Sequence, residues 1–390
     1  MNSINEQHFL AGKRIIIAGA GIGALSFSIA FHQLLDGKIQ PPPLVTIYER
    51  DTSTDAIGRE GYSLSIRGDA LSGGMQTLQK LGFLDELLAQ SNPGTHFTFF
   101  NNDFSPLLQI RTPPVEGLSQ TTMRIARSKL REILLKNVPS SVVINWDCAV
   151  KSAEELADGQ ILVNLADGTQ QHCDLLVAAD GSNSAIRKAL RPEHVLNFAG
   201  AIGGDGHFVF VAPSDRTSAL WSVSYLTNTP REAKSAGTMT DDEIDAVLAE
   251  AKERTKAFGE PIPTLLKETL RSSIAIFNSK DIVPFRNQGS IVFIGDAQHA
   301  MSPFAGNGAN MAIMDGYQLA DQLIHAQDLK TAIKAYDDLS IPRSTRAINI
   351  SHRSISIVHS RGIWKHMWVS VLRLLAWYFG LNYKEDQEST

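Results

Sequence analysis

The chain has 390 residues, 43% of them hydrophobic and 20% charged, which is typical of a globular protein large enough for more than one core. Its formal net charge of −5 gives no electrostatic basis for binding nucleic acid, so no nucleic-acid partner is expected. The two cysteines, Cys148 and Cys173, form neither a disulfide framework nor a metal-ligand pattern, so we expect no metal and a reducing, cytoplasmic location.

The first predicted elements are a strand, a glycine-rich turn, a helix and a second strand. The run "KRIIIA" at 13–18 predicts a short buried strand, and "GAGIGA" follows it at once. The run "LSFSIAFHQLL" then has helical spacing, and "LVTIYER" at 44–50 predicts the second strand. This order is typical of the first unit of a doubly wound parallel sheet.

The glycine-rich turn fits the dinucleotide-binding fingerprint. Gly19 permits a tight turn, Gly21 lets the backbone approach a pyrophosphate, and the small Ala24 lets helix and strand pack closely. The start of the helix offers N–H groups and positive potential to phosphates. Glu49 ends the second strand, where its carboxylate can accept hydrogen bonds from ribose hydroxyls. The alternative is an ordinary glycine-rich turn with a surface glutamate, but the context favours a nucleotide site.

The middle of the chain changes from helical to alternating patterns. Asp167-Gly168 lies between two alternating runs and predicts a hairpin. Asp180 follows a buried strand and opens a helix, although alone it is equally compatible with a turn capped by Ser182 or Ser184. From 198 to 282, alternating runs surround one acidic helix, which predicts a separate sheet-based domain.

A second glycine-rich stretch, "GDAQHAMSPFAGNGAN", lies between a strand and a helix at 295–310. Asp296 is expected at the carboxyl end of the strand, where doubly wound sheets bind ligands. Pro303 restricts the turn, whereas Gly306 and Gly308 remove side chains so that the backbone can meet a flat ligand. The next helix would direct its positive end at that ligand. An NAD-binding fold needs no second site of this kind, but a flavin does, and a capped turn is the remaining alternative.

Together these motifs resemble the group A flavoprotein monooxygenases, the aromatic hydroxylases with the p-hydroxybenzoate hydroxylase fold. Within that family the chain is most similar to the tetracycline-inactivating and polyketide-directed enzymes. The resemblance implies that Glu49 and Arg50 hold the adenosine end of FAD, Asp180 lies near the pyrophosphate, and Asp296 lies on the ribityl chain. The residues that it places at FAD are Gly19, Gly21, Ala24, Glu49, Arg50, Arg59, Arg127, Asp180, Asp296, Pro303, Gly306, Gly308 and Asn310.

The implied fold is α/β, with a doubly wound Rossmann-like FAD-binding domain, an inserted β-sheet substrate domain and a C-terminal helix. The expected segments are FAD domain 1–75, FAD and part of the substrate domain 76–190, substrate sheet 191–285, FAD domain 286–345 and helical tail 346–390.

The implied reaction uses NADPH or NADH, which reduces FAD, and O₂, which forms a flavin C4a-hydroperoxide that hydroxylates an aromatic or polyketide-like small molecule. A tetracycline-like substrate is within this class, but Trp221 stands where the tetracycline enzymes carry a histidine, which counts against tetracycline itself. No protein residue is assigned a catalytic role, and His299 is expected to be structural, satisfied within its own turn. Candidate substrate contacts, each also compatible with simple packing, are His207, Trp221, Tyr225, Met301 and Phe304.

Three other functions are compatible with parts of this pattern. An FAD-dependent reductase or dehydrogenase of the same fold would not use O₂, and a non-catalytic flavin or ligand carrier would not be reduced by NAD(P)H. A plain NAD-dependent dehydrogenase would leave the stretch at 295–310 unexplained. The resemblance is compatible with a monomer or a weak dimer.

The tail carries a tryptophan-rich amphipathic run, "IWKHMWVSVLRLLAWYFGL", at 363–381. Trp364, Trp368, Val371 and Leu375 recur at helical spacing and form one apolar face. One hypothesis makes this helix an interfacial membrane anchor. The other docks the helix across the two domains to help close the pocket. We favour docking because the family resemblance supports it and no polybasic cluster accompanies the helix.

Overall fold

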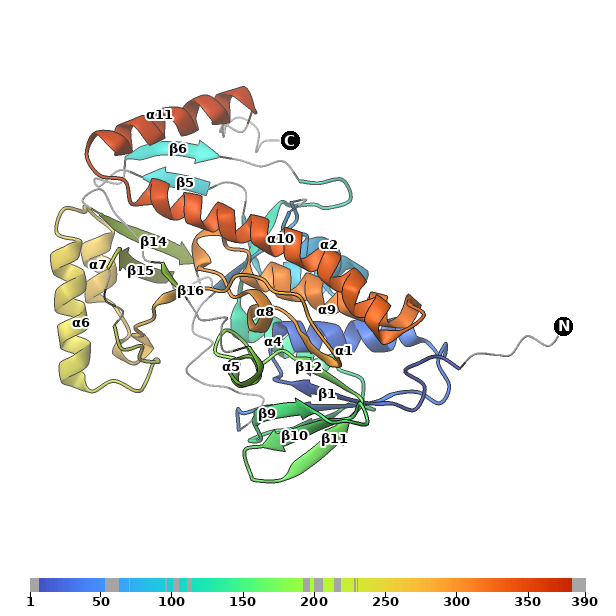
Figure 1. The fold of residues 1–390 in the computed structure, drawn as a ribbon. Helices are drawn as coiled ribbons and strands as arrows, with labels where there is room; N and C mark the ends of the chain where they lie inside the picture. Colours follow the sequence, from blue (N-terminus) through green and yellow to red (C-terminus); the bar gives the residue numbers. More distant parts are fainter. Residues whose placement is uncertain are drawn as a thin grey trace.

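The fold was analysed in a computed structural model, which describes residues 7–52, 63–69, 71–94, 97–100, 105–110, 114–191, 197–199, 206–213, 219–227, 229 and 231–380. A parallel five-stranded sheet lies at its centre, in the strand order β17-β12-β1-β2-β8. Helices α1, α9 and α10 lie on one side of this sheet, and an antiparallel sheet of β9, β10 and β11 lies on the other (Figure 1). The parallel strands are β1 (Arg14–Ala18), β2 (Leu44–Tyr48), β8 (Val143–Asn145), β12 (Leu175–Ala178) and β17 (Ile291–Phe293). The other elements are α1 (Ile22–Leu35), α9 (Gly308–His325), α10 (Leu329–Val358), β9 (Val150–Glu155), β10 (Ile161–Leu165) and β11 (Gln170–Cys173).

Strand β1 forms where the apolar run predicts it, and it occupies the middle of the sheet. Four of its five residues are buried, because a central parallel strand is covered on both faces. Ile17 is the partner of Ile47 in β2 and of Val177 in β12. The predicted strand, turn, helix and strand are therefore confirmed, and so is the hairpin at Asp167-Gly168, which joins β10 to β11.

The parallel order brings distant parts of the sequence to one edge of the sheet. Strands β1, β2, β12 and β17 all run in the same direction, so their carboxyl ends lie together. The residues that follow these ends are Gly19, Glu49, Asp180 and Gly295. This is the edge at which open α/β sheets bind ligands.

A smaller sheet, in the order β3-β7-β4, lies beside helices α2 and α9, and β3 contacts both of these helices. Ser65 of β3 lies opposite Arg124 of β7 in this sheet. The segment before the last parallel strand contains the antiparallel hairpin of β14 and β15, a short pair of β13 and β16, and the helices α6 and α7. These elements are α2 (Gly74–Lys80), β3 (Ser63–Arg67), β4 (Asn92–Gly94), β7 (Thr122–Ala126), β13 (Asn197–Ala199), β14 (His207–Pro213), β15 (Ala219–Tyr225), α6 (Asp241–Arg254), α7 (Ile262–Lys267) and β16 (Ser279–Asp281).

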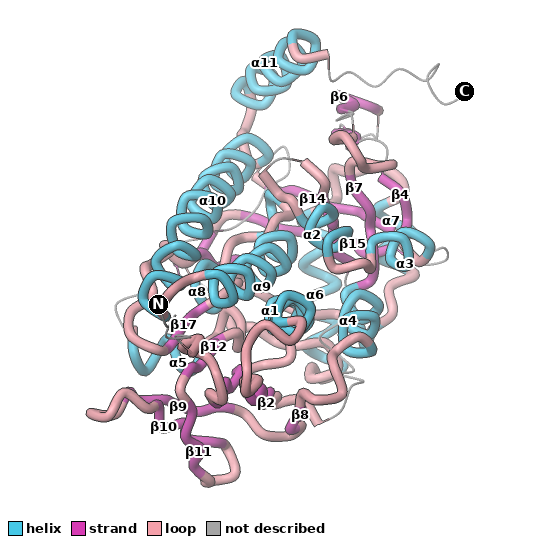
Figure 2. The backbone as a smooth tube through the Cα atoms, turned by 90° about the vertical axis from the view of Figure 1, so that its right-hand side faces the viewer, coloured by secondary structure: helices cyan, strands magenta, loops and turns pink. Residues whose placement is uncertain are grey.

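The tryptophan-rich tail is a helix, α11 (Ile363–Tyr378), which stands at the outer end of α10 and away from the parallel sheet (Figures 1 and 2). It contacts β6 (Pro106–Ile110), which pairs with β5 (Phe97–Phe100), and the end of α10. Its large apolar side chains are mostly exposed: Trp377 retains 70% of its accessible surface and Ile363 79%. Within the described ranges, no helix has both the length and the apolarity to cross a membrane. Docking and surface anchoring both stay predictions for α11.

Candidate functional site

The first turn of the site follows β1 and requires glycine. Gly19 has φ +95°, and a Cβ placed there would lie 2.8 Å from the carbonyl oxygen of Ala179, so a side chain at this position would clash with the end of β12. The Gly19 N–H donates to the carbonyl of Tyr48 at 2.8 Å. The turn is therefore bound to the ends of both neighbouring strands.

Helix α1 begins directly after this turn and presents its start to open space. Gly21 is the N-cap, and no side chain there satisfies the first N–H groups. A Cβ on Gly21 would meet nothing within 4 Å, so the backbone is accessible on that side. Ala24 is fully buried, as expected for the small residue of the fingerprint. These features fit a site for a phosphate group at the start of a 14-residue helix.

Glu49 lies at the end of β2, buried beside the turn. One of its carboxylate oxygens accepts a hydrogen bond from the Ala20 N–H, and the other accepts from the Asp51 N–H at 3.0 Å. Because each carboxylate oxygen has two lone pairs, these bonds leave room for a ribose hydroxyl. Arg50 is half exposed and 3.9 Å from Asp51, so its role at the adenosine end stays a prediction, and Arg59 lies outside the described residues.

Arg131 is a buried cation that the sequence analysis missed. Only 2% of its side chain is exposed, its Nε–H donates to the Ala20 carbonyl at 3.1 Å, and it lies 3.8 Å from Asp51. Its guanidinium also stacks on Trp146 at 5.6 Å. Arg131 belongs to α4 (Arg127–Lys136), one helical turn after the predicted Arg127, and this spacing was the signal that could have found it.

Asp180 follows β12 and lies at the start of α5 (Ala185–Leu190). Its Oδ2 accepts the Ala185 N–H at 2.8 Å, whereas its buried Oδ1 has no hydrogen-bond partner within the described part of the chain. Burial raises the pKa of the Asp180 carboxyl, and these local hydrogen bonds oppose that effect. Ser184 caps α5 by accepting the Arg187 N–H, so the capped turn is real. An acceptor oxygen is left for a ligand.

Asp296 begins the short helix α8 (Asp296–His299) directly after the Gly295 turn. Asp296 is exposed to solvent, but protein packs closely around its carboxyl group. The resulting desolvation raises the pKa of this carboxyl. The charges of His299, Arg127 and Arg187 act against that rise. A Cβ on Gly308 would lie 3.7 Å from Asp296 Oδ1, so the carboxylate stands beside the start of α9. Asp296 is thus a solvent-accessible acceptor at the β17 end of the carboxyl edge.

The second glycine turn precedes α9. Pro303 begins a 3₁₀ turn (Pro303–Ala305), and Gly306 follows with φ +62°, a conformation that favours glycine. Asn310 is buried, and its amide N–H donates to the carbonyls of Ser65 and Gly306 at 2.9 and 3.0 Å while its Oδ1 accepts the Arg67 N–H. The Asn310 side chain therefore joins the turn to β3, and its predicted contact with a ligand stays a prediction.

The start of α9 has no side-chain cap. Asn307 is the N-cap, but its side-chain oxygen accepts from the hydroxyl of Ser72 at 2.7 Å and does not reach the helix N–H groups. The first N–H groups of this 18-residue helix therefore have no side-chain partner at the N-cap. They supply positive potential beside Asp296 and Gly308, as the sequence analysis expected.

A buried ion cluster is hydrogen-bonded to the Gly295 turn at this edge. Asp315 of α9 accepts the Gly295 N–H at 2.9 Å, pairs with His299 at 2.6 Å, and is also bound by Arg343 and Ser340 of α10. Burial alone would raise the pKa of Asp315, but the charges of His299 and Arg343 outweigh it and hold that pKa well below its usual range. The expectation that His299 is satisfied within its own turn was wrong, because its partner lies on the next helix.

The candidate substrate contacts divide between two faces of the hairpin of β14 and β15. His207 lies opposite Tyr225 in the register, and Arg254 of α6 touches both, at 3.0 Å from His207 Nε2 and 3.5 Å from the Tyr225 ring centroid. Trp221, on the same face of the hairpin, donates to the hydroxyl of Thr269 at 2.9 Å. These three side chains are thus turned toward α6 and its neighbours.

The other face of the hairpin points to the second glycine turn. The Phe208 ring lies 6.3 Å from that of Phe304, which follows Pro303 and also packs edge-on against His359. Met301 is half-buried just before this turn. The structure therefore brings Phe304, but not His207, Trp221 or Tyr225, into the space between hairpin and turn, and it adds Phe208, which the sequence analysis had not selected.

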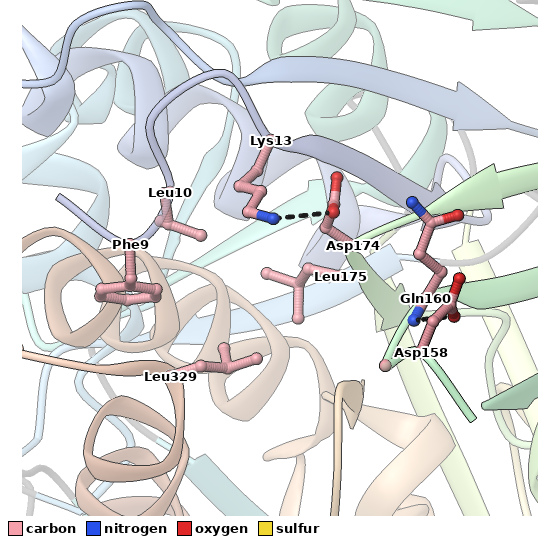
Figure 3. A pocket seen from close by; sticks show the side chains of 9 residues that line it. Phe9, Leu10, Lys13, Asp158, Gln160, Asp174, Leu175 and Leu329 are labelled. Carbon is pink, nitrogen blue, oxygen red and sulfur yellow. Dashed lines mark hydrogen bonds and ion pairs between the residues drawn. The ribbon is translucent and has the colours of Figure 1, made fainter. Parts of the chain in front are cut away.

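A separate cavity of about 330 Å³ lies at the amino ends of the parallel strands (Figure 3). Phe9, Leu329 and Leu175 supply apolar walls, and Lys13 pairs with Asp174 at 3.0 Å. This cavity is at the opposite edge of the sheet from Gly19 and Asp296, and it has none of the glycine turns described above. We therefore place the functional site at the carboxyl edge.

Comparisons with known proteins identify the family of the chain. The model of the family described as "FAD binding domain" matches residues 59–354. The chain is 32% identical to the monooxygenase cfoF of Aspergillus candidus, over 92% of this chain and 94% of that protein. Its fold is similar to Klebsiella pneumoniae HpxO, solved with FAD and uric acid (TM-score 0.73, 21% identity, 95% of each chain), and to the tetracycline destructase Tet(55) (TM-score 0.69, 17% identity, 95% of this chain and 97% of that one).

Proposed function

The chain belongs to the FAD-binding-domain family, as a class A flavin-dependent monooxygenase, and from this premise we propose that it uses NAD(P)H and O₂ to hydroxylate an aromatic or polyketide-like small molecule. The observation that carries the proposal is the pairing of two uncapped helix starts with two aspartates at one sheet edge. The starts of α1 and α9 offer N–H groups, and Asp180 and Asp296 each offer an acceptor oxygen.

This arrangement fits FAD better than a nucleotide without a flavin. NAD needs one glycine turn and one helix start, which the segment around Gly19 and Gly21 already provides. The second turn, with Gly306, Gly308 and the start of α9, would then serve the flavin end, and Asp296 would accept from its hydroxyl-bearing chain. FAD, when bound, supplies the electron transfer and the oxygen activation.

The residues of the chain would bind and orient the cofactor and the substrate, and they would exclude water. The positive end of α9 would stabilise negative charge on a reduced ring. Arg131 and Glu49 would hold the β1–α1 turn in place at the adenosine end. Phe208 and Phe304 would form an apolar wall where a flat substrate can stack. The similarity of the fold to that of the tetracycline destructase Tet(55) supports a polyketide-like substrate within this class.

We expect the purified protein to be yellow, with tightly bound FAD that is released on denaturation because no covalent attachment is required. The absorbance spectrum before and after denaturation measures this. NAD(P)H oxidation should then rise when phenols or aromatic polyketides are added. A colourless protein that also fails to take up FAD would refute the assignment, and a flavin that NAD(P)H cannot reduce would indicate a carrier.

A further inference from the structure

Arg124 is a half-buried cation between the β3-β7-β4 sheet and the substrate hairpin. Its neighbours in β7, Met123 and Ile125, point into the core and are 0% and 1% exposed. Because side chains alternate along a strand, Arg124 points to the opposite face, which looks away from that core. Ser65 of β3 lies directly opposite it in the register.

Among the residues that the structure describes, the partners of Arg124 are all uncharged. Its Nη1 donates to the Ser65 hydroxyl at 2.8 Å, and its Nη2 donates to the carbonyl oxygen and the hydroxyl of Ser63. A guanidinium has five N–H donors, so at least two remain, and the buried Nε–H has no partner within the described ranges. No carboxylate of the described chain pairs with Arg124. Burial lowers the pKa of this arginine, which reflects the cost of a buried charge without a counter-ion.

The position of Arg124 connects it to both parts of the site. Ser65 Cβ lies 3.9 Å from where a Cβ on Gly306 would stand, so the Arg124–Ser65 pair adjoins the second glycine turn. The guanidinium also lies over the ring of Phe210, 5.5 Å from its centroid. Phe210 and Phe208 share one face of β14, and Phe208 packs near Phe304. The Arg124 guanidinium thus lies beside the apolar wall of Phe208 and Phe304.

We propose that Arg124 binds an oxyanion of the substrate, either a carboxylate or an ionised phenol or enol, beside the second glycine turn. An anion there would supply the missing counter-charge and accept the unused N–H donors, for which the planar guanidinium is well shaped. The phenylalanines would hold the ring that carries this oxygen. This inference rests on the proposed function and narrows its substrates to acidic aromatic or enolised polyketide molecules.

The test compares an anion with its neutral analogue on the FAD-loaded protein. Equilibrium dialysis with benzoate and with benzamide should show tighter binding of benzoate to the wild type. Arg124→Gln should weaken benzoate binding about 10- to 100-fold, because a charge-assisted hydrogen bond is lost, and leave benzamide binding unchanged. Arg124→Lys should retain part of the preference because it keeps the charge but not the fork.

Arg254→Gln is the matched control, since Arg254 also stacks on an aromatic ring of this hairpin but on the face toward α6. It should bind benzoate as the wild type does. Three results would overturn the proposal. The first is equal binding of benzoate and benzamide, and the second is unchanged benzoate affinity in Arg124→Gln. The third is loss of FAD from that variant, which would make Arg124 a cofactor residue. Benzoate binding needs no turnover, so an Arg124-dependent benzoate site without hydroxylation would refute only the monooxygenase.

Discussion

Asp296→Ala is expected to weaken FAD binding about 10- to 150-fold, since a charge-assisted hydrogen bond to a ligand is worth about 1.5–3 kcal/mol. The Asp296 carboxylate is accessible to solvent, adjoins the start of α9 and makes no cap for its own helix. Its removal should therefore leave the fold intact and act on the cofactor alone. Titration of the FAD-free variant with FAD, followed by flavin fluorescence, measures the change.

Two further variants make this prediction specific. Asp180→Ala should lose less FAD affinity but more thermal stability, because Asp180 also accepts the Ala185 N–H at the start of α5. Asp158→Ala, beside the cavity at the opposite edge of the sheet, should bind FAD as the wild type does. Unchanged FAD affinity in Asp296→Ala would remove this residue from the site.

The second large effect is expected on stability, from Asp315→Asn. Asp315 is fully buried between His299 and Arg343, so a neutral side chain would leave two buried donors without their counter-charge. Breaking a buried pair in this way costs about 3–5 kcal/mol of the free energy of unfolding. Denaturant unfolding followed by fluorescence measures it. Asp338→Asn is the matched control, since Asp338 pairs with Arg286 and Lys334 at the surface and should change stability by no more than about 1 kcal/mol.

The effect of Asp315→Asn should depend on pH in a defined direction. The folded-state pKa of Asp315 is depressed, so its carboxylate contributes stability that is fully present above the unfolded pKa of about 3.9. That contribution is lost as the pH falls through the lower folded-state pKa. The difference between wild type and variant should thus be constant near neutral pH and narrow only in acid. A difference below about 1 kcal/mol at pH 7 would contradict the buried ion cluster.

The parts of the fold that depend on local pattern could be predicted from the sequence. The run before Gly19 is apolar at consecutive positions, which indicates a strand buried on both faces, and the glycines at 19 and 21 indicate a tight turn into a helix. The sequence therefore predicts β1 and α1 together. The hairpin at Asp167 and the turn at Gly306 can be predicted from local pattern in the same way. In each case the deciding interactions lie within a few residues.

The contacts between distant segments could not be predicted in this way. Arg131 meets Ala20 across 111 positions, and Asp315 meets Arg343 from another helix, so neither partner is visible in a local pattern. On the hairpin, a strand alternates between two faces, and nothing in the run "HFVFVAP" says which of them is turned to the glycine turn. The sequence therefore suggested His207, whereas the register brings Phe208 to that side.

The measurement that tests the central claim most directly is the incorporation of oxygen from ¹⁸O₂. The FAD-loaded enzyme is supplied with NAD(P)H and with the compound that most increases NAD(P)H oxidation. The mass of the product is then measured by mass spectrometry. A monooxygenase inserts one atom of O₂ into the product and releases the other as water, so one ¹⁸O per product molecule is expected. Conversion of the compound under ¹⁸O₂ without any label would contradict the monooxygenase and identify the chain as an FAD-dependent reductase or dehydrogenase.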